Sequence, residues 1–275
     1  MTTFRASPGF TSSWEHFDFT VTDGVGTVTF TRPDKLNALT FAVYADLRDL
    51  LAELGASEHV KVLVITGQGD GFCSGGDVTE IIGQLQSMDS ADLLTFTRMT
   101  GAVIQRMREL PIPIIAAVNG VAAGAGAVIA LAADLRVVAR SAKLAFLFTR
   151  VGLAGADMGA AYLLPRLIGL AKASELLILG DSVDAERADR IGLVTSLVDD
   201  AELAAAAGEM ARRLAEGPSL AYGTTKSLLA REQDMSLAAA IELEAQTQAL
   251  LMTAKDHREF STAHQEGRRP QWSGR

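Results

Sequence analysis

The sequence predicts an α/β fold built from repeated strand, glycine turn and helix units, followed by a helical C-terminal region. Two strands of the buried type, Val60–Thr66 and Ile114–Val118, each run into a glycine-containing turn and then into a helical stretch. From about Met158 onward the pattern is mainly helical, with Leu193–Val198 as an exception. No linker or second core interrupts the 275 residues, so we expect one domain.

The first elements are a hairpin and a capped helix. The strands Phe17–Val21 and Val25–Thr31 are separated by Asp23-Gly24, a dipeptide typical of hairpin turns. Thr40 is an expected N-cap for a helix whose apolar residues keep helical spacing as far as Leu54.

The later elements follow the same logic. We expect a small-residue helix over Gly124–Ala133 and strands over Leu135–Ala139 and Leu144–Phe148. Pro218 opens one C-terminal helix and Ser236–Leu251 forms another. The predicted divisions are an N-terminal extension (1–16), an α/β core (17–200) and a helical region (201–275).

Composition excludes several function classes. The formal net charge is −8, which argues against a general nucleic-acid binder. Cys73 is the only cysteine and the four histidines lack metal-site spacing, so we expect no metal. Residues 1–16 lack an apolar run, and glycines and prolines interrupt the apolar stretch Ile112–Ala133. We therefore expect a cytoplasmic protein without a membrane span.

Two turns share a feature that suggests chemistry. Ser74 and Ala125 each lie in a small-residue turn after a buried strand and before a predicted helix. Small residues let a ligand oxygen approach the unpaired N–H groups of a helix start. Two such turns facing each other would form an oxyanion hole, a pair of N–H donors for a carbonyl acquiring negative charge. The competing interpretation is that the glycines only make tight turns.

An ordered set of motifs carries a family resemblance over nearly the whole chain. The chain resembles the enoyl-CoA hydratase/isomerase, or crotonase, superfamily in Arg32-Pro-Asp-Lys-Leu-Asn-Ala-Leu39, Ile65-Thr-Gly67, Phe72-Cys-Ser-Gly-Gly-Asp-Val78, Pro113-Ile-Ile-Ala-Ala-Val-Asn-Gly120, Leu164-Pro-Arg-Leu-Ile-Gly169, Gly180-Asp181 and Ala188–Val194.

The resemblance implies a crotonase-type spiral of ββα units and an acyl-CoA thioester substrate. It implies no separate cofactor, since coenzyme A is part of the substrate, and a homotrimer or homohexamer. It assigns the oxyanion donors to the backbone of Ser74 and Ala125. The residues that it places at the substrate or the coenzyme A moiety are Lys35, Leu36, Ala38, Gly75, Gly76, Asp77, Gly124 and Phe148.

Two departures from the resemblance bear on the reaction. Hydratases of this superfamily carry two glutamates, and the matching positions here are Val128 and Phe148. Neither side chain can orient a water molecule or transfer a proton, so simple hydration of an enoyl-CoA is disfavoured.

Asp157 is the remaining candidate acid or base. Its context, Asp157-Met-Gly-Ala-Ala-Tyr-Leu-Leu-Pro-Arg166, is similar to ring-1,2-epoxyphenylacetyl-CoA isomerases, where an aspartate moves a proton, and to 4-chlorobenzoyl-CoA dehalogenases, where it is a nucleophile. Asp157 could also cap a helix over Met158–Leu167, and a helix start would lower its pKa.

Other residues rank lower. Arg150 could pair with Asp157 or a substrate carboxylate, although a solvated charge is the simpler interpretation. Cys73 is read as a small apolar residue beside the turn. An acyl pocket and ordinary core packing are both open for Phe146, Phe148, Met158 and Tyr162. The tail departs from the superfamily at His264 and Gly267, where Arg268 could substitute in contacting coenzyme A.

The sequence thus predicts an acyl-CoA isomerase that stabilises a thioester enolate, with catalytic residues Ser74, Ala125 and Asp157. The alternatives are a hydrolase or dehalogenase using Asp157, a residual enoyl-CoA hydratase, and a non-catalytic protein that binds coenzyme A.

Overall fold

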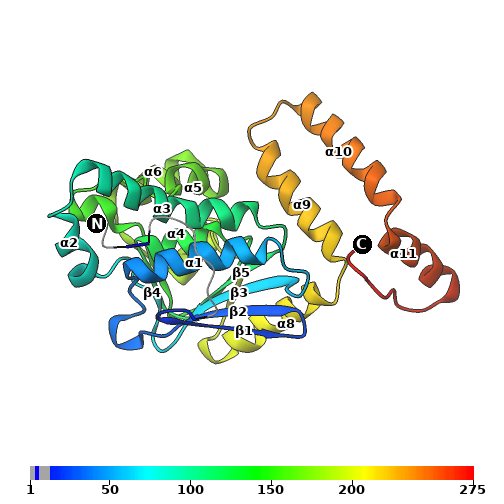
Figure 1. The fold of residues 1–275 in the computed structure, drawn as a ribbon, viewed down its shortest axis with the longest axis horizontal. Helices are drawn as coiled ribbons and strands as arrows, with labels where there is room; N and C mark the ends of the chain where they lie inside the picture. Colours follow the sequence, from blue (N-terminus) through cyan, green and yellow to red (C-terminus); the bar gives the residue numbers. More distant parts are fainter. Residues whose placement is uncertain (1–3, 6–12) are drawn as a thin grey trace.

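Two β-sheets form the centre of the molecule in the computed structural model, which describes residues 4–5 and 13–275 (Figure 1). The larger sheet has the strand order β1-β2-β3-β5-β7-β10. Its strands are β1 (Phe17–Thr22), β2 (Val25–Phe30), β3 (Val62–Gly67), β5 (Ile114–Val118), β7 (Leu135–Ala139) and β10 (Ser196–Val198). The β1–β2 hairpin is antiparallel and the other neighbours are parallel.

The smaller sheet has the order β4-β6-β8-β9. Its strands are β4 (Gly71–Cys73), β6 (Val121–Ala123), β8 (Lys143–Ala145) and β9 (Ser182–Asp184). β4, β6 and β8 follow β3, β5 and β7 after short turns, so the chain alternates between the two sheets. This repetition of two strands and a helix confirms the predicted α/β fold.

Helices cover the sheets and close the units. Those of the α/β core are α1 (Phe41–Leu54), one π-helical turn (Val78–Ile82), α2 (Gly83–Leu85), α3 (Ser90–Glu109), α4 (Ala125–Ala132), α5 (Ala160–Ile168), α6 (Leu170–Leu179), α7 (Ala185–Arg190) and α8 (Leu203–Ala215). Every residue of α4 is buried, which explains its composition of small and apolar side chains. Three 3₁₀ turns span Pro33–Lys35, Leu147–Val151 and Asp200–Glu202.

Polar caps set several helix starts. The Thr40 hydroxyl accepts a hydrogen bond from the Val43 amide at 3.3 Å, as the sequence predicts. Ser236 caps its helix in the same way, through the Ala239 amide at 3.3 Å. These side chains satisfy amides that the first helical turn leaves without a backbone partner.

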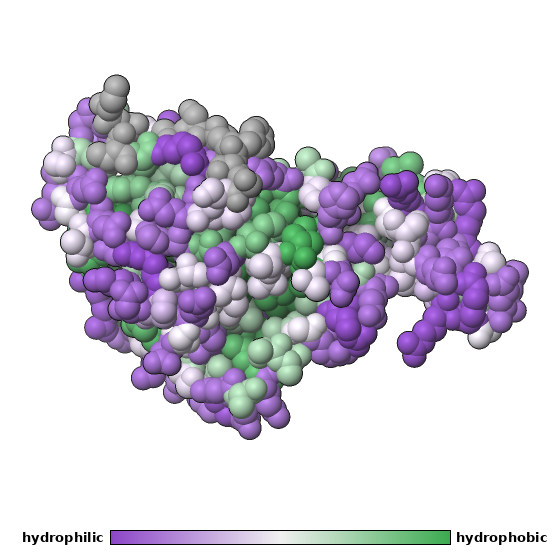
Figure 2. All heavy atoms as spheres, turned by 60° about the horizontal axis from the view of Figure 1, so that its bottom comes forward, coloured by the Kyte–Doolittle hydropathy of each residue, from purple (hydrophilic) through white to green (hydrophobic). Residues whose placement is uncertain are grey.

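The C-terminal helices extend away from the sheets. α9 (Ser219–Glu232), α10 (Leu237–Met252) and α11 (Lys255–Glu266) form the arm at the right of Figure 1. Figure 2 shows that this arm carries mainly hydrophilic residues on the face in view, whereas apolar residues gather over the body. The predicted division of the chain at 200–201 stays a prediction.

Several elements differ from the expectations. The strand expected over Leu144–Phe148 ends at Ala145, and the chain then turns into the 3₁₀ segment that carries Phe148. The helix expected from Met158 begins at Ala160, because Met158 and Gly159 both have positive φ angles. β10 covers only the end of Leu193–Val198, and β9 carries no clear alternating pattern in sequence.

The described part of the predicted N-terminal extension packs on the core. The Phe4 ring stacks on Phe41 with ring centroids 5.2 Å apart. Arg5 forms ion pairs with Asp46 at 2.6 Å and with Asp49 at 2.8 Å, both on α1. Residues 1–3 and 6–12 lie outside the described part of the chain, so the extension is placed only at these contacts and from Ser13 onward.

Candidate active site

The two glycine turns predicted to face each other are in direct contact. A Cβ atom built on Gly75 would stand 2.9 Å from the Ala123 carbonyl oxygen and 3.4 Å from the Ala125 amide nitrogen. A Cβ atom on Gly124 would lie 3.9 Å from the Gly75 Cα atom. Gly75 and Gly124 both have positive φ angles, +97° and +51°. Glycine at these positions therefore allows a close approach that most other residues would obstruct.

Hydrogen bonding decides which amides of the first turn are available. The Ser74 amide donates to the Leu36 carbonyl oxygen at 2.9 Å, and the Asp77 amide donates to the Leu39 carbonyl oxygen at 2.8 Å. The Ser74 amide is thus engaged within the protein, which corrects the expectation that it is an oxyanion donor. The physical reason is the pairing of this turn with residues 36–39, which lie far away in sequence.

Gly76 presents the free amide of this turn. The Leu39 amide donates to the Gly75 carbonyl oxygen at 2.7 Å, so Gly75 and Asp77 both bond toward Leu39. Successive peptide groups of an extended segment point in opposite directions, and the Gly76 N–H therefore points away from Leu39. It forms no hydrogen bond with the described residues.

The second turn presents the start of a buried helix. Ala125 is the first residue of α4, and the preceding Gly124 offers no capping side chain. The first helical hydrogen bond runs from the Val128 amide to the Gly124 carbonyl oxygen at 3.1 Å. The Ala125 amide is one of the donors that a helix start leaves unpaired, at the positive end of the helix dipole. Gly76 and Ala125 thus place two N–H groups on facing turns.

Asp157 lies in the loop before α5 and is half-buried. Its carboxylate accepts a hydrogen bond from the Met158 amide at 2.8 Å. Burial raises the pKa of this carboxyl above its ordinary value, and the Met158 hydrogen bond opposes the shift only in part. The expected capping role is wrong, because Gly159 is the N-cap and forms no side-chain cap. The expected lowering of the pKa is also wrong, because burial outweighs the Met158 hydrogen bond.

The positions matching the hydratase glutamates are apolar and buried. Val128 in α4 is 0% exposed, and Phe148 in the 3₁₀ turn Leu147–Val151 is 9% exposed. Neither side chain carries an atom that could accept a proton. Asp157 is consequently the candidate acid or base that follows these turns along the chain.

Sequence reasoning missed Tyr44. It lies among the residues of α1 that keep helical apolar spacing, and it is 3% exposed. Its hydroxyl, however, lies beside the first turn, since a Cβ atom on Gly76 would stand 3.8 Å from the Tyr44 oxygen. The sequence signal that could have identified Tyr44 is a side chain with a polar hydroxyl among the apolar residues on one face of the helix.

The residues expected around coenzyme A surround the first turn. Pro33–Lys35 forms a 3₁₀ turn that ends at Leu36, and Lys35 and Leu36 are exposed. Ala38 is half-buried, and its carbonyl oxygen accepts a hydrogen bond from Arg32 at 2.8 Å. The structure therefore brings Lys35, Leu36 and Ala38 to the edge of the Gly75–Gly76 turn.

Asp77 has a clear structural role. Its carboxylate accepts hydrogen bonds from the Thr79 and Glu80 amides at 2.9 and 3.0 Å. The two amides and the Arg32 guanidinium, 3.0 Å away, lower the pKa of this carboxyl. Asp77 thus fixes the exit of the glycine turn.

Three lower-ranked residues have other partners. Arg150 pairs with the exposed Asp181, not with Asp157. Arg268 pairs with Glu259 and Glu266 at 2.6 Å each, so its charge is already engaged beside α11. Cys73 is fully buried, and burial raises the pKa of its thiol to about 12, which fits the prediction of a small apolar residue.

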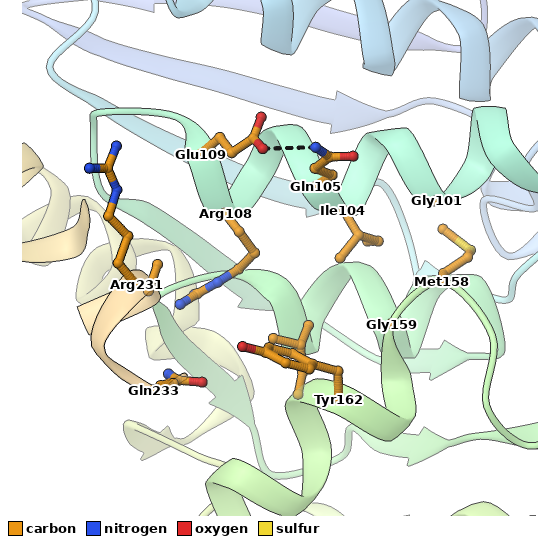
Figure 3. Close-up of a pocket in the computed structure, with 12 residues that line it drawn as sticks. Gly101, Ile104, Gln105, Arg108, Glu109, Met158, Gly159, Tyr162, Arg231 and Gln233 are labelled. Atoms are coloured by element: carbon orange, nitrogen blue, oxygen red, sulfur yellow. Dashed lines mark hydrogen bonds between the residues drawn. The ribbon is translucent and has the colours of Figure 1, made fainter. Parts of the chain in front are cut away.

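A cavity of 830 Å³ lies next to the Asp157 loop, between α3, α5 and the end of α9. Figure 3 shows Met158 and Tyr162 on one side of it and Ile104 and Gln105 of α3 on the other. Two of the four residues considered for an acyl pocket, Met158 and Tyr162, therefore border open space. Phe146 and Phe148 are buried in the core.

The described residues contain neither a metal-binding cluster nor a membrane-spanning helix. No cluster of three or more histidine, cysteine, aspartate or glutamate side chains there is arranged to hold a metal ion. None of the helices in residues 4–5 and 13–275 has the length and apolar character needed to cross a membrane.

Comparisons with known proteins find similar sequences over nearly the whole chain. A family model described as enoyl-CoA hydratase/isomerase matches residues 20–275. The chain is 36% identical over 260 residues to 1,2-epoxyphenylacetyl-CoA isomerase from Escherichia coli K12, covering 93% of this chain and 97% of that protein. It is 34% identical over 264 residues to a candidate enoyl-CoA hydratase from Rhodobacter capsulatus, covering 96% and 100%.

A solved structure is similar over the full length. The crystal structure of a candidate enoyl-CoA hydratase from Streptomyces coelicolor A3(2) matches with a TM-score of 0.95 and 60% sequence identity. The match covers 100% of both chains.

Proposed function

Because the chain belongs to the enoyl-CoA hydratase/isomerase family, we propose that it is an acyl-CoA isomerase that shifts a double bond through a thioester enolate. The family acts on acyl-CoA thioesters, and its members include relatives named as isomerases and as hydratases. The observation that carries the proposal is the combination of a two-amide turn pair with the half-buried carboxyl group of Asp157.

The amides of Gly76 and Ala125 bind the thioester oxygen in this proposal. Removing a proton from the carbon next to the thioester carbonyl places negative charge on that oxygen. Two N–H donors held by the surrounding hydrogen bonds stabilise the charge without reorganising, and the α4 dipole adds to the effect. This replaces Ser74 with Gly76 as the first donor and keeps Ala125 as the second.

Asp157 moves the proton. A carboxylate in water is a weak base, and burial makes it stronger because it disfavours the charged form. The raised pKa of Asp157 supports this role, since the group can remove a proton from one carbon and return it to another. The substrate and the product then have equal mass, and no water enters the reaction.

The apolar replacements disfavour hydration. A hydratase must orient and activate a water molecule, which requires polar side chains beside the enoyl group. Val128 and Phe148 supply none, and both are buried. Isomerisation needs only one group that carries the proton, and Asp157 is sufficient for that.

Coenzyme A lies at the edge of the first turn in this proposal. Lys35, Leu36 and Ala38 together with Gly75, Gly76, Asp77 and Gly124 line its path. The exposed Lys35 ammonium suits a phosphate group of the coenzyme. The cavity beside Met158 and Tyr162 offers space for the far end of a bulky acyl group.

We also propose a homotrimer or homohexamer. Large apolar side chains are exposed on α6, α9 and α10, including Leu170, Ile178 and Leu237 at 72%, 68% and 77%. Large exposed apolar side chains, here on the core helix α6 and on the arm helices α9 and α10, are typical of surfaces that another subunit covers.

The test compares Asp157→Asn with Asp181→Asn. The asparagine side chain would keep the shape of Asp157 and the acceptor for the Met158 amide but could not carry a proton. We expect kcat of isomerisation to fall by about 10²- to 10⁴-fold for Asp157→Asn. Asp181 is exposed and pairs with Arg150, so Asp181→Asn is expected to keep the parent rate. Mass spectrometry of a panel of straight-chain, branched and aromatic enoyl-CoA thioesters supplies the readout.

Three results would contradict the proposal. Full isomerase activity of Asp157→Asn would remove Asp157 from the mechanism. A mass gain of one water on an enoyl-CoA would identify a hydratase, and solvent oxygen in a released free acid would identify a hydrolase. Tight binding of thioesters with no turnover across the panel would identify a non-catalytic protein.

A further inference from the structure

Tyr44 is held rigidly beside the glycine turn. Its ring packs edge-on against Phe96, with centroids 5.9 Å apart and planes at 85°. Phe96 packs in the same manner against Phe41, with centroids 5.1 Å apart. α1 anchors the backbone, and these aromatic contacts fix the ring, so the hydroxyl has a defined position next to Gly76.

The Tyr44 hydroxyl has no hydrogen-bond partner among the described residues, although the side chain is 3% exposed. An apolar side chain lies beside it at Gly76. A Cβ atom built on Gly76 would stand 3.7 Å from the Ile81 Cδ1 atom and 3.8 Å from the Tyr44 hydroxyl oxygen. The hydroxyl oxygen is not among the fully enclosed side-chain atoms that lack a partner in the described residues, so it borders space that a ligand can reach. A donor that faces such space without a protein partner is free to bind a ligand oxygen.

The hydroxyl is a donor under all ordinary conditions. Burial raises the pKa of Tyr44 well above its ordinary value, and the nearby Cys73 and Asp157 raise it further. The Asp157 carboxylate is close enough to the phenol to contribute to this rise in its pKa. The phenol therefore stays neutral and offers its proton for hydrogen bonding.

We propose that Tyr44 is a specificity-determining residue that donates a hydrogen bond to an oxygen substituent on the acyl group, near the carbon that exchanges its proton. The inference rests on the proposed function in placing the thioester oxygen at Gly76 and Ala125. From that anchor, the first carbons of the acyl group lie beside Gly76, next to the phenol. The preferred substrates are then acyl-CoA thioesters with a hydroxyl, ether or carbonyl oxygen at this position, and unsubstituted acyl chains leave the donor unpaired.

The experiment measures binding of two matched probes by titration calorimetry. The probes are butanoyl-CoA and 3-hydroxybutanoyl-CoA, the latter as separate enantiomers. All proteins carry Asp157→Asn to prevent turnover, and the mass of the recovered ligand checks that none occurred. Tyr44→Phe removes only the hydroxyl oxygen. Tyr222→Phe, on α9 and away from the turns, is the matched control.

We expect the parent to bind one 3-hydroxybutanoyl-CoA enantiomer about tenfold more tightly than butanoyl-CoA, the effect of one buried hydrogen bond. Tyr44→Phe should lose this preference and keep the affinity for butanoyl-CoA, whereas Tyr222→Phe should change neither affinity. Equal affinity of the parent for all probes, an unchanged preference in Tyr44→Phe, or an equal loss for both probes would overturn the proposal.

Two checks separate this proposal from the others. Thermal unfolding of Tyr44→Phe distinguishes a folding defect, which would lower the affinity for every probe, from the loss of one donor. The binding preference is measured without turnover, so it stands or falls independently of whether Asp157 catalyses isomerisation.

Discussion

The proposed site combines the two glycine turns with the Asp157 loop, and these segments would act by different physical means. The turns use backbone amides, and their contacts are so close that a Cβ atom on Gly75 would meet the Ala123 carbonyl oxygen at 2.9 Å. The Asp157 loop uses a side chain, and its neighbours Val151 and Leu153 are exposed. In the proposed reaction the fold would therefore fix the anion-binding part, whereas individual side chains on an accessible segment would choose the reaction.

This difference explains how one family can include several activities. A pair of backbone donors serves any reaction that develops charge on a thioester oxygen. The outcome then depends on which side chains face the neighbouring carbons. In the proposal for this chain those are Asp157 and Tyr44, with apolar residues at Val128 and Phe148.

The strongest test of the part of the site that is made of backbone amides is Gly126→Ala in α4. A Cβ atom there would stand 2.0 Å from the Cys73 carbonyl oxygen, so α4 must shift and carry the Ala125 amide with it. We expect kcat/KM to fall by about 10²- to 10³-fold, as when one oxyanion donor is removed. Gly208→Ala in α8 is the control, because nothing lies within 4 Å of its Cβ position. A Gly126→Ala enzyme with the parent kcat/KM would refute the contact-based account.

A second test compares neighbouring glycines under the same substitution. Gly75→Ala must adopt a φ of +97° and press on the Ala123 oxygen, which costs roughly 1–3 kcal/mol. Gly76→Ala keeps its amide and finds only ordinary contacts, the closest at 3.7 Å. We expect urea unfolding to show a marked loss of stability for Gly75→Ala alone, with activity reduced accordingly. Equal effects in the two variants would mean that the positive φ angle and the close contact at Gly75 do not decide the stability of the turn.

The smallest effect concerns the stability cost of Asp157. Its raised pKa means that the folded state binds a proton more tightly than the unfolded chain does. Its contribution to stability therefore falls as the pH rises from the ordinary carboxyl pKa through the raised one. Asp157→Asn should raise the melting temperature slightly at neutral pH, and the gain should vanish below the ordinary carboxyl pKa. Parallel melting curves of Asp181→Asn control for general charge effects, and a neutral-pH loss in Asp157→Asn would contradict the sign.

Much of the fold follows from local sequence. Strands such as Ile114–Val118 and the Thr40 cap are determined by residue pattern and by short-range hydrogen bonding, and both match the structure. The strand expected over Leu144–Phe148 failed at its end because Phe148 is buried in a 3₁₀ turn, and an apolar residue reads the same in either element. The helix expected from Met158 begins later because Met158 has a positive φ angle. Methionine rarely adopts such an angle, so its presence in the sequence did not indicate it.

The candidate site also has features that follow from the local sequence and features that depend on folding. The sequence alone determined the family resemblance, the small residues of both turns, the loss of two carboxylates at Val128 and Phe148, and the presence of Asp157. Only the tertiary structure decided that Gly76 rather than Ser74 has a free amide, that burial raises the pKa of Asp157, and that the Tyr44 hydroxyl meets the glycine turn. The reason is that each of these depends on contacts between segments far apart in sequence. Residues 36–39 pair with 74–77, and α1 packs beside the same turn, so the partner of an amide or hydroxyl is set by folding and not by its neighbours along the chain.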